Sequence, residues 1–506
     1  MFKVLADVGG YRGHRLPPPD HFGDQLPRPF YTFLDLGTRW HRFDPLEAHK
    51  YRASCLESYS VGFSWCCIGN MADNHVVPSL ANLPAVLAAV QGMHLAVLAD
   101  CGAARAAILR RRDERRRRRR ATWVDPWLMK RVRLGWYHTL MVELEREHTS
   151  HFKNFLRVTP AHFDELLARI TPRIERCDTN YRAAIPPGMK LAITLRFLAT
   201  GNSYASLAFG FRVAKCTIGV IVPVVCQAII TEFQDEVVST PRTPDDWRAV
   251  ARGFSNRWNF QHCLGALDGK HVAIRCPRNG GSLFYNYKGF HSIVMMALVD
   301  SDYKFIWVDI GSYGSASDAQ IFNHSELYEM IEDRELGFPA AEPLVGDDEA
   351  VPYFLIGDDA FALQSWMMKP FSRRNMQRDE RIFNYRLSRA RRVVENAFGI
   401  LAQRFGCLLR TLPQQPVTVQ KVVMACVVLH NILRERNIGR HNRNLDEEDV
   451  DHNVIPGAWR QAQAMHDMEE LHGGNRQSRL AKRQRLLLKH YYNNGVGAVE
   501  WQDAMI

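Results

Sequence analysis

The sequence predicts an α/β core preceded by an all-helical domain. Two observations predict this class. Within residues 259–436, short apolar stretches bounded by turn residues alternate with longer stretches of helical spacing. The 506 residues are also 46% hydrophobic and 24% charged, which is typical of a globular chain long enough for two or three domains. We therefore divide the chain into an unassigned N-terminal region (1–120), a helical domain (121–258), the core (259–436) and a polar, basic C-terminal tail (437–506).

Four stretches of the core have the composition of strands, since they are apolar, rich in β-forming residues and bounded by turn residues. They are residues 262–274, 290–299, 304–310 and 351–356. The first is interrupted by Asp268 and Gly269, and the second ends at the turn residue Asp300. These stretches predict the strands of a sheet.

Two further stretches of the core have helical spacing. From Asp318 onward, apolar residues recur at positions that share one face of a helix, and either Ser317 or Asp318 is a reasonable N-cap. Residues 383–405 predict a longer helix, with apolar positions near heptad spacing and arginines on the other faces. Glu395 lies on this second helix.

Four acidic residues lie at the ends of these strands or on these helices: Asp268, Asp318, Asp358 and Glu395. An isolated aspartate before glycine is most often a turn residue, so no single one of them indicates a site. Carboxylates that a fold gathers within a few ångströms repel one another, however, and normally share a cation. All four offer oxygen ligands, with no thiolate or imidazole at metal-binding spacing, which favours Mg²⁺ or Mn²⁺ over Zn²⁺.

The chemistry that such a site indicates is hydrolysis or strand transfer of nucleic acid. Two hard ions, roughly 3.5–4 Å apart, activate a water or hydroxyl and stabilise the leaving oxygen in phosphodiester cleavage. Lys270, His271, Lys288 and His291 are close to the acids in sequence and are candidates for contacting phosphate, although solvated or structural roles fit them equally. Hydrolysis of nucleotides is disfavoured, because the chain has no loop of the type Gly-x-x-x-x-Gly-Lys-Ser/Thr.

Residues 201–221 predict a helix-turn-helix. The pattern is a short helix, a turn at Gly210–Arg212 and a second helix that begins near Ala214. The apolar residues that would hold the two helices together are Leu207, Phe211 and Ile218. Lys215 and Thr217 would then be exposed to a major groove, although an ordinary helical hairpin packed on the core has the same pattern.

The charge of the chain agrees with a nucleic-acid partner. A net charge of +11 and a pI near 9.1 attract phosphate without any sequence recognition. Residues Arg110–Arg120 include nine arginines, and Lys482–Arg485 is a smaller basic group. Either segment suits a nuclear import signal or a phosphate-binding arm, and the alternative is a solvated charged helix face.

The compartment that the sequence indicates is the nucleus, and the cytoplasm also fits. The eleven cysteines include no Cys-x-x-Cys pair, so neither a zinc module nor a disulfide framework is expected. Residues 1–109 match no pattern that assigns them a role. The apolar stretch 83–99 contains Gln91 and His94 and is too short for a membrane span, so no membrane partner is expected.

From about Arg115 to Gln502 the chain resembles PIF/Harbinger-type transposases and the nucleases derived from them. Five ordered motifs carry the resemblance: Leu267-Asp-Gly-Lys-His-Val-Ala-Ile274, Tyr285-Asn-Tyr-Lys-Gly-Phe-His-Ser292, the Ser-x-x-Asp of Ser315–Asp318, Gly357-Asp358, and Val394-Glu-Asn-Ala-Phe-Gly399. Two later segments are similar to the tail of the same family: Val427–Leu433 and Gly495–Gln502.

The resemblance implies a DDE endonuclease core of the ribonuclease-H-like kind, a mixed sheet flanked by helices. In that core the first acid lies on the first strand, the second just after the fourth strand and the third on a following helix. This makes Asp268, Asp358 and Glu395 the catalytic triad, with Asp318 as an additional metal ligand that could exchange roles with Asp358. The four residues would hold two Mg²⁺ or Mn²⁺ ions.

The resemblance also supports the helix-turn-helix and implies a separate Myb-like partner protein that assists DNA binding and nuclear entry. A metal-dependent DNA endonuclease, transposase-like or transposase-derived, is the function expected. The rival is a domesticated protein that keeps DNA or partner contacts without cleavage. Because both have the same acids, they differ in whether the cluster binds metal tightly enough to act.

Overall fold

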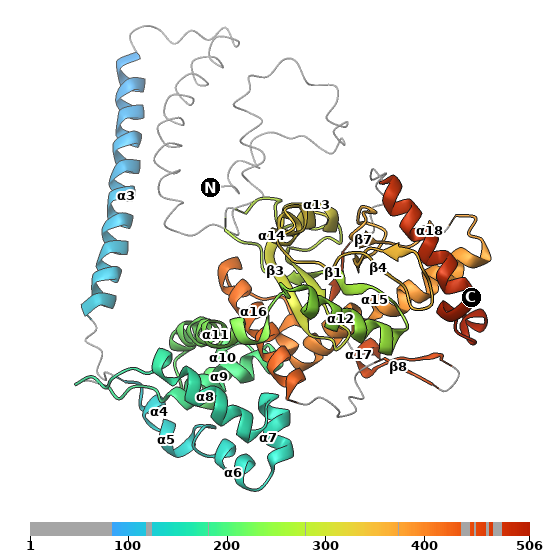
Figure 1. Ribbon diagram of the computed structural model, residues 1–506. Coiled ribbons are helices and arrows are strands. Elements are labelled where there is room, and N and C mark those ends of the chain that lie inside the picture. Colours follow the sequence, from blue (N-terminus) through green and yellow to red (C-terminus); the bar gives the residue numbers. More distant parts are fainter. Residues whose placement is uncertain are drawn as a thin grey trace. The chain divides into compact units, whose positions relative to one another are not determined.

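The computed structural model describes residues 83–117, 124–180, 182–278, 280–372, 374–436, 446–449, 452–461, 465–468 and 478–506. The chain divides into two compact units, Met1–Ala121 and Thr122–Ile506 (Figure 1). The second unit contains the helical region, the sheet and the C-terminal residues.

The described part of the first unit is one helix, α3 (Leu83–Arg117), which includes most of the arginine run. Its residues 91–110 are exposed. By length and composition alone, three described helices could cross a membrane: Gln91–Arg110 within α3, α11 (Lys215–Val237) and α16 (Pro416–Glu435). Both α11 and α16 are partly buried inside the second unit, where they pack against each other. Residues 1–82, for which the sequence predicted no role, lie outside the described residues.

Nine helices precede the sheet in the described part of the second unit. They are α4 (Pro126–Met129), α5 (Arg131–Leu134), α6 (Leu140–Arg146), α7 (Thr149–Leu156), α8 (Pro160–Ile174), α9 (Pro187–Thr200), α10 (Tyr204–Phe211), α11 and α12 (Pro244–Trp258). Local sequence explains several starts. Thr159 and Thr243 accept a backbone N–H as N-caps, and each is followed by a proline at the first helical position, where no N–H is needed.

The central sheet is mixed and has the order β3-β2-β1-β6-β7. Its strands are β1 (Cys263–Ala273), β2 (Ser292–Val299), β3 (Phe305–Tyr313), β6 (Phe354–Ile356) and β7 (Met367–Met368). Neighbouring strands are antiparallel from β1 to β3 and parallel from β1 to β7. The four predicted strands are therefore present: β1, β2 and β6 are shorter than expected, and β3 extends three residues further, to Tyr313. The two-residue strand β10 (His466–Asp467) also pairs with β1.

Helices and short elements complete the unit. The helices are α13 (Asp318–Asn323), α14 (Glu326–Glu332), α15 (Arg378–Arg404), α16, α17 (Ala458–Gln461) and α18 (Arg479–Asn493), with 3₁₀ helices η5 (Gly406–Leu409), η6 (Gly495–Gly497) and η7 (Gln502–Met505). Two small ladders pair β4 (Glu342–Pro343) with β5 (Ala350–Val351), and β8 (Glu447–Glu448) with β9 (Val454–Ile455). The chain is thus a mixed α/β protein.

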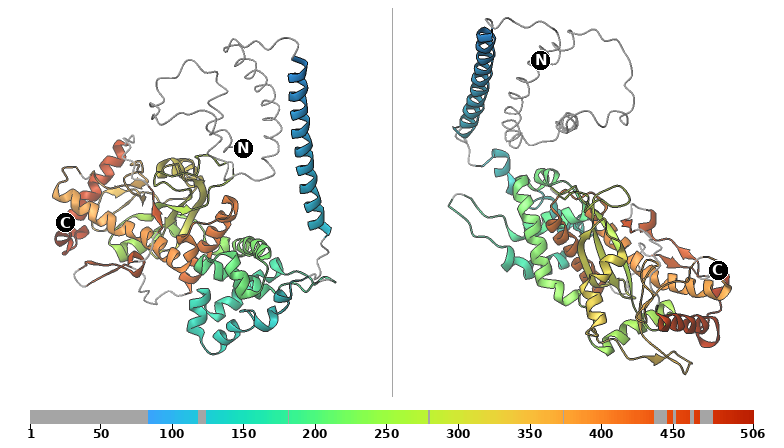
Figure 2. Two further views of the ribbon diagram at one scale, coloured as in Figure 1. Left: turned by 180° about the vertical axis from the view of Figure 1, so that it is seen from behind. Right: turned by 90° about the horizontal axis from the view of Figure 1, so that it is seen from above.

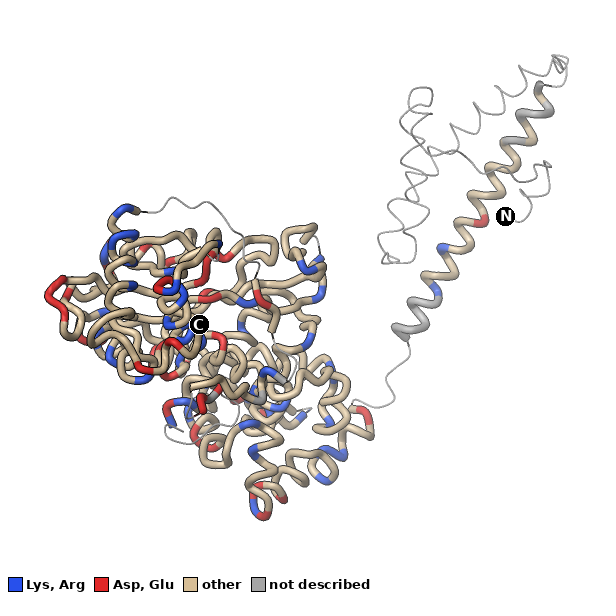
Figure 3. The backbone as a smooth tube through the Cα atoms, turned by 90° about the vertical axis from the view of Figure 1, so that its right-hand side faces the viewer, with Lys and Arg blue, Asp and Glu red and all other residues tan. Residues whose placement is uncertain are grey.

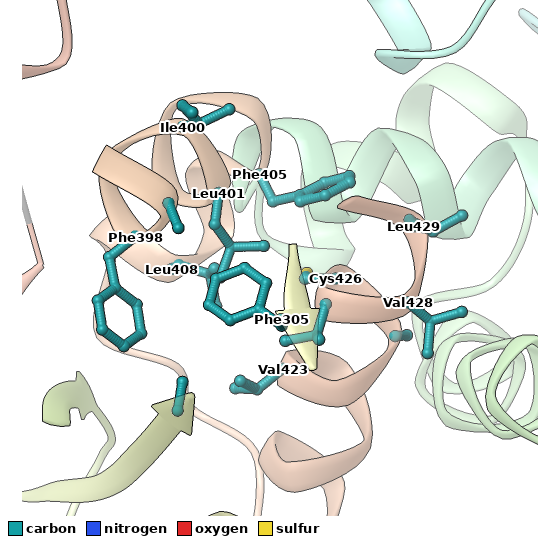
Figure 4. Packing of buried hydrophobic residues seen from close by; sticks show 14 of the residues in the cluster. Phe305, Phe398, Ile400, Leu401, Phe405, Leu408, Val423, Cys426, Val428 and Leu429 are labelled. Carbon is teal, nitrogen blue, oxygen red and sulfur yellow. The ribbon is translucent and has the colours of Figure 1, made fainter. Parts of the chain in front are cut away.

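Both faces of the sheet are covered, as Figures 1 and 2 show. Along β2, Ile293 and Met295 belong to one hydrophobic cluster, whereas Val294 and Met296 belong to a second. A strand buried on both faces is apolar at every position instead of alternating, which explains the continuous apolar run of β2. In Figure 4, Phe305 of β3 lies among residues of α15 and α16 in the first cluster. Helices α15 and α16 therefore form a layer that packs against one face of the sheet.

Candidate metal centre

Three of the four predicted acids meet where the short strand β6 ends beside the middle of β1. Asp268 lies on β1, opposite Ala297 of β2, and Asp358 follows β6, the parallel neighbour of β1. Asp318 is the first residue of α13, whose N-cap is Ser317, one of the two expected caps. One carboxylate oxygen from each aspartate lies within 4.8 Å of the others. The fold therefore brings together residues that are 90 positions apart in the sequence.

A glycine makes this approach possible. The side chain of Asp318 lies where a β-carbon on Gly269 would be, so any larger residue at this position would displace the carboxylate. The Asp-Gly pair of β1 is therefore not a turn. Asp268 supplies an oxygen ligand, and the next residue leaves room for a second carboxylate.

The three carboxylates are buried, so their negative charges are destabilised unless a positive charge lies close to them. Asp268, Asp318 and Asp358 are only 6%, 1% and 8% exposed. The pKa of Asp318 is raised well above its ordinary value, first by burial and then by the charges of Asp268 and Asp358. Its Oδ1 atom is buried and has no hydrogen-bond partner among the described residues. An orphaned carboxylate oxygen between two other carboxylates fits a hard divalent cation such as Mg²⁺ or Mn²⁺.

Glu395 lies on α15, as expected, and lines the same cavity, but it is outside the group of three. The cavity has a volume of about 300 Å³ and includes Glu395 together with the three aspartates. The carboxylate of Glu395 instead forms ion pairs with Arg391 and Arg460, each at 3.3 Å. All four predicted acids therefore share one cavity, with three in mutual contact and the fourth held by arginines.

Lys270 is a cationic residue in direct contact with the aspartates. Its Nζ lies 3.0 Å from Oδ2 of Asp268 and also pairs with Asp467. Burial lowers the pKa of Lys270, but the two carboxylates raise it further, so the net shift is upward and the ammonium stays charged. Together, five carboxylates and three cationic side chains line the cavity, a formal deficit of two positive charges. One divalent cation would balance that deficit.

Two of the basic residues beside the acids differ in their roles. Lys270 lines the cavity, so a contact with substrate is open to it. His271 points elsewhere, since it is 1% exposed and its Nδ1 lies 3.0 Å from Oγ of Ser292. Burial, followed by the charges of Lys288 and His466, lowers the pKa of His271 to about 4, so the ring is neutral at pH 7. We assign His271 a structural role.

The sequence did not predict a group of cavity residues that comes from the C-terminal region. They are Trp459, Arg460, Met465, Asp467 and Met468. Strand β10 brings Asp467 opposite Lys270, along the part of β1 that extends beyond its pairing with β6. A two-residue strand has no detectable periodicity, so the only available signal was the mixture of acidic and aromatic residues after 445.

Residues 446–449 belong to the region predicted as a polar, basic tail, and their acidic side chains pair with arginines of the second unit. Asp446 is only 6% exposed and accepts hydrogen bonds from Arg460. Glu448 accepts two hydrogen bonds from Arg389 of α15, at 2.8 and 2.7 Å. The acidic residues are held because Arg460 of α17 and Arg389 of α15 provide their partners, a relationship that local composition does not show.

A second, larger cavity adjoins the first. It has a volume of about 690 Å³ and shares Asp358 and Arg391 with the acid-lined cavity. Its wall adds Phe371, Arg374 and Tyr385, whose hydroxyl has no hydrogen-bond partner among the described residues. The cavity that adjoins the acids is thus lined by cationic, aromatic and hydroxyl groups.

The segment expected to be a helix-turn-helix is a pair of helices with a tight connection. Helix α10 ends at Arg212, which has a left-handed backbone (φ 52°), and α11 begins at Lys215 after Ala214. The predicted contact residues are fully buried: Leu207, Phe211 and Ile218. Lys215 is exposed and Thr217 is half-buried. These features agree equally with a helix-turn-helix and with a helical hairpin.

Comparison with protein families decides the class of the core. Residues 267–431 match the model of the DDE superfamily endonuclease family, and this range contains all four acids. This part of the chain is a DDE superfamily endonuclease domain. Asp446, Arg460 and Asp467 lie beyond the range matched by the DDE domain.

The chain is also similar to curated proteins from animals and plants. It is 24% identical over 265 residues to "Putative nuclease HARBI1" of Xenopus laevis, an alignment that covers 51% of this chain and 71% of the relative. "Protein ALP1-like" of Arabidopsis thaliana is 22% identical over 263 residues, covering 51% of this chain and 62% of the relative. These matches confirm the predicted resemblance to nucleases derived from Harbinger transposases. No solved structure matches the chain significantly.

Proposed function

We propose that this protein is a metal-dependent endonuclease that cleaves DNA phosphodiester bonds, as a transposase or a transposase-derived nuclease. The observation that carries the proposal is the meeting of Asp268, Asp318 and Asp358 within 4.8 Å, in a cavity that Glu395 also lines. Lys270 pairs with Asp268, but five carboxylates and only three cationic side chains line the cavity. A bound divalent cation would balance this excess of negative charge.

The strand order supports a ribonuclease-H-like core. Asp268 is on the first strand of the central sheet, and Asp358 lies two residues after β6, the fourth strand of that sheet along the chain. Glu395 lies on the long helix that follows. On this basis Asp268, Asp358 and Glu395 are the catalytic triad that we propose. Asp318 is the fourth metal ligand, with a closer contact to the other two aspartates than Glu395 has.

The proposed division of labour follows from the residues of the cavity. Bound Mg²⁺ or Mn²⁺ would supply Lewis acidity that activates water and stabilises the departing oxygen. Asp268, Asp318, Asp358 and Glu395 would hold the ions, and Lys270 and Arg391 would face the phosphate oxygens of the strand. Trp459, Met465 and Met468 add apolar groups to the wall of the cavity beside the carboxylates.

DNA contacts are proposed for three regions. These are the helix pair α10–α11, acting as a helix-turn-helix, the arginine run of residues 110–120, and the larger cavity beside Asp358. Acidic and basic residues are interspersed over the second unit, as Figure 3 shows, so its attraction for DNA depends on local groups and not on one uniformly basic face. Nuclear action with a Myb-like partner protein is part of the same proposal.

The test is nicking of supercoiled plasmid by the full chain with Mg²⁺, Mn²⁺ or EDTA. Asp268→Asn and Asp358→Asn should each abolish nicking, because each removes a charged oxygen ligand. Asp333→Asn, at an exposed acid outside both cavities, should cleave like the wild type. If folded wild-type protein binds DNA but does not nick it with either metal, with or without the partner, the protein is the non-cleaving binding protein instead.

A further inference from the structure

Arg460 is the cationic residue of the acid-lined cavity that the DDE domain itself does not provide. It lies on α17, which follows the matched range by 27 residues and packs against α15. It shares the cavity with Asp268, Asp318 and Asp358. A positive group from outside the domain is therefore placed beside the proposed metal ligands.

The guanidinium of Arg460 is anchored before any substrate arrives. Its Nε donates to Oδ1 and Oδ2 of Asp446 at 3.0 and 2.9 Å, and its Nη2 donates to Oδ2 at 2.7 Å. The carboxylate of Asp446 is 1% exposed and also accepts the N–H of Gly457 at 2.9 Å. The guanidinium lies 4.4 Å from the ring centre of Trp459, whose Nε1 donates to Asn396 at 2.8 Å. These contacts fix the orientation of the charged group.

The contact between Arg460 and Glu395 is of a different kind. It is a single hydrogen bond of 3.3 Å, and the two side chains are 36% and 27% exposed. Glu395 has a second partner in Arg391, also at 3.3 Å. A long, partly solvated ion pair contributes little, whereas the buried, bidentate pair with Asp446 is costly to break. Glu395 is therefore the exchangeable partner of Arg460, and Asp446 is the permanent one.

A substrate strand would change the balance in a defined way. The proposed function requires Glu395 to bind the metal. The Nη2 atom of Arg460 then loses its hydrogen bond to the Glu395 carboxylate. A DNA strand in the same cavity brings anionic phosphate oxygens, for which a planar, anchored guanidinium is the best-matched side chain. Lys270 keeps a partner on the domain in Asp268, whereas Arg391 shares Glu395 with Arg460 and lacks the carboxylate of Asp446 that anchors Arg460.

We propose that Arg460 binds a phosphate group of the DNA strand in the acid-lined cavity, exchanging Glu395 for a phosphate oxygen while Asp446 holds its guanidinium in place. Asp446 is then a positioning residue. This inference rests on the proposed function, because it requires DNA in this cavity. It assigns part of the substrate-binding surface to a segment that lies beyond the DDE domain.

The experiment measures binding of a fluorescent DNA duplex to the full chain by anisotropy, with Ca²⁺ in place of Mg²⁺, over a range of KCl concentrations. Loss of one phosphate contact reduces the slope of log K against log[salt] by about 0.9. We expect this reduction and a several-fold weaker affinity for Arg460→Gln. Arg460→Lys keeps the charge and should keep the wild-type slope with intermediate affinity. Asp446→Asn should weaken binding without removing the charge.

Two controls separate this role from a structural one. Arg173→Gln removes an exposed arginine that pairs with Glu232 and lines neither cavity, and it should leave the slope unchanged. Mn²⁺ binding without DNA, measured by calorimetry, should be as tight or tighter in Arg460→Gln, because Glu395 is released. Weaker Mn²⁺ binding would show that Arg460 only supports the acid cluster, and this overturns the proposal.

The remaining outcomes are also distinct. A wild-type slope in Arg460→Gln overturns the phosphate contact even if the wild type cleaves DNA. A reduced slope in that variant, with no cleavage by the wild type in Mg²⁺, leaves the contact in place and removes the endonuclease function. A folded wild type that binds no DNA overturns both.

Discussion

Asp318 at the start of α13 occupies the space that a β-carbon of residue 269 on β1 would need. The two residues are 49 positions apart, and the contact is possible only because glycine has no side chain at that point of the strand. The third carboxylate of the cluster therefore depends on a residue that carries no functional group.

We expect Gly269→Ala to weaken metal binding at least about tenfold, or about 1.4 kcal/mol, because the added methyl group displaces the Asp318 carboxylate. Calorimetric titration with Mn²⁺ measures the effect. Gly219→Ala on α11 is the matched control, since the nearest atoms to its added methyl group are 3.8 Å away. A metal affinity equal to that of the wild type in Gly269→Ala would show that Asp318 is not a ligand.

Replacing Asp318 itself should separate folding from metal binding. The pKa of this buried carboxyl is raised by burial and by two neighbouring carboxylates, so its charge opposes folding when no cation is present. In EDTA, Asp318→Asn should raise the Tm by at least about 2 °C. The increase in Tm that Mn²⁺ gives the wild type should disappear in the variant. Lower stability of Asp318→Asn in EDTA would show that the charge is already compensated within the protein.

The strands that the sequence predicted are those with a continuous apolar run. Burial on both faces makes β2 apolar at each position, and a run of that kind is visible without a structure. Strands β7 and β10 have two residues each, and no pattern can be recognised in so short a segment. Their positions depend on tertiary contacts such as the pairing of Asp467 with Lys270.

The four acids could be predicted because each lies in a recognisable local motif, but their partners could not. Nothing in the sequence around Glu395 indicates that it pairs with Arg460. That arginine lies 65 positions later and is oriented by Asp446. Such ion pairs depend on the path of the chain over α15. The sequence therefore predicts acids that the structure brings into one cavity, whereas the structure is needed to show which of them pair with cationic side chains.

The docking of the C-terminal residues on α15 should depend on one buried arginine. Arg386 is 1% exposed, and its guanidinium donates to Gly497 O at 3.2 Å, Gln502 Oε1 at 3.0 Å and the carbonyl of Asn259. Arg386→Met would remove a donor from each of these acceptors, of which Gln502 Oε1 keeps the N–H of Val499, and this should lower the free energy of unfolding by about 2–4 kcal/mol. Urea unfolding measures this change.

The control for that prediction is on the same helix. Arg378 is 57% exposed and pairs with Asp503, so Arg378→Met should change stability by less than about 1 kcal/mol. Limited proteolysis should also release residues 478–506 faster in Arg386→Met than in Arg378→Met. Equal stability of the two variants would mean that the C-terminal residues are held by apolar contacts alone.

The turn between β2 and β3 should make the stability depend on pH. Asp300 is 8% exposed, and burial, opposed by N–H groups of Lys304 and Asp302, raises its pKa to about 6. A carboxyl whose pKa is higher in the folded protein stabilises the fold at low pH, and this contribution is lost as the pH rises from about 4 through 6. Asp300→Asn keeps the hydrogen-bond acceptor without the charge. It should therefore match the wild type at pH 4.5 and exceed it by roughly 1–3 kcal/mol at pH 7.5 in urea unfolding. A difference that is the same at both pH values would show that Asp300 is ionised in the folded protein throughout this range.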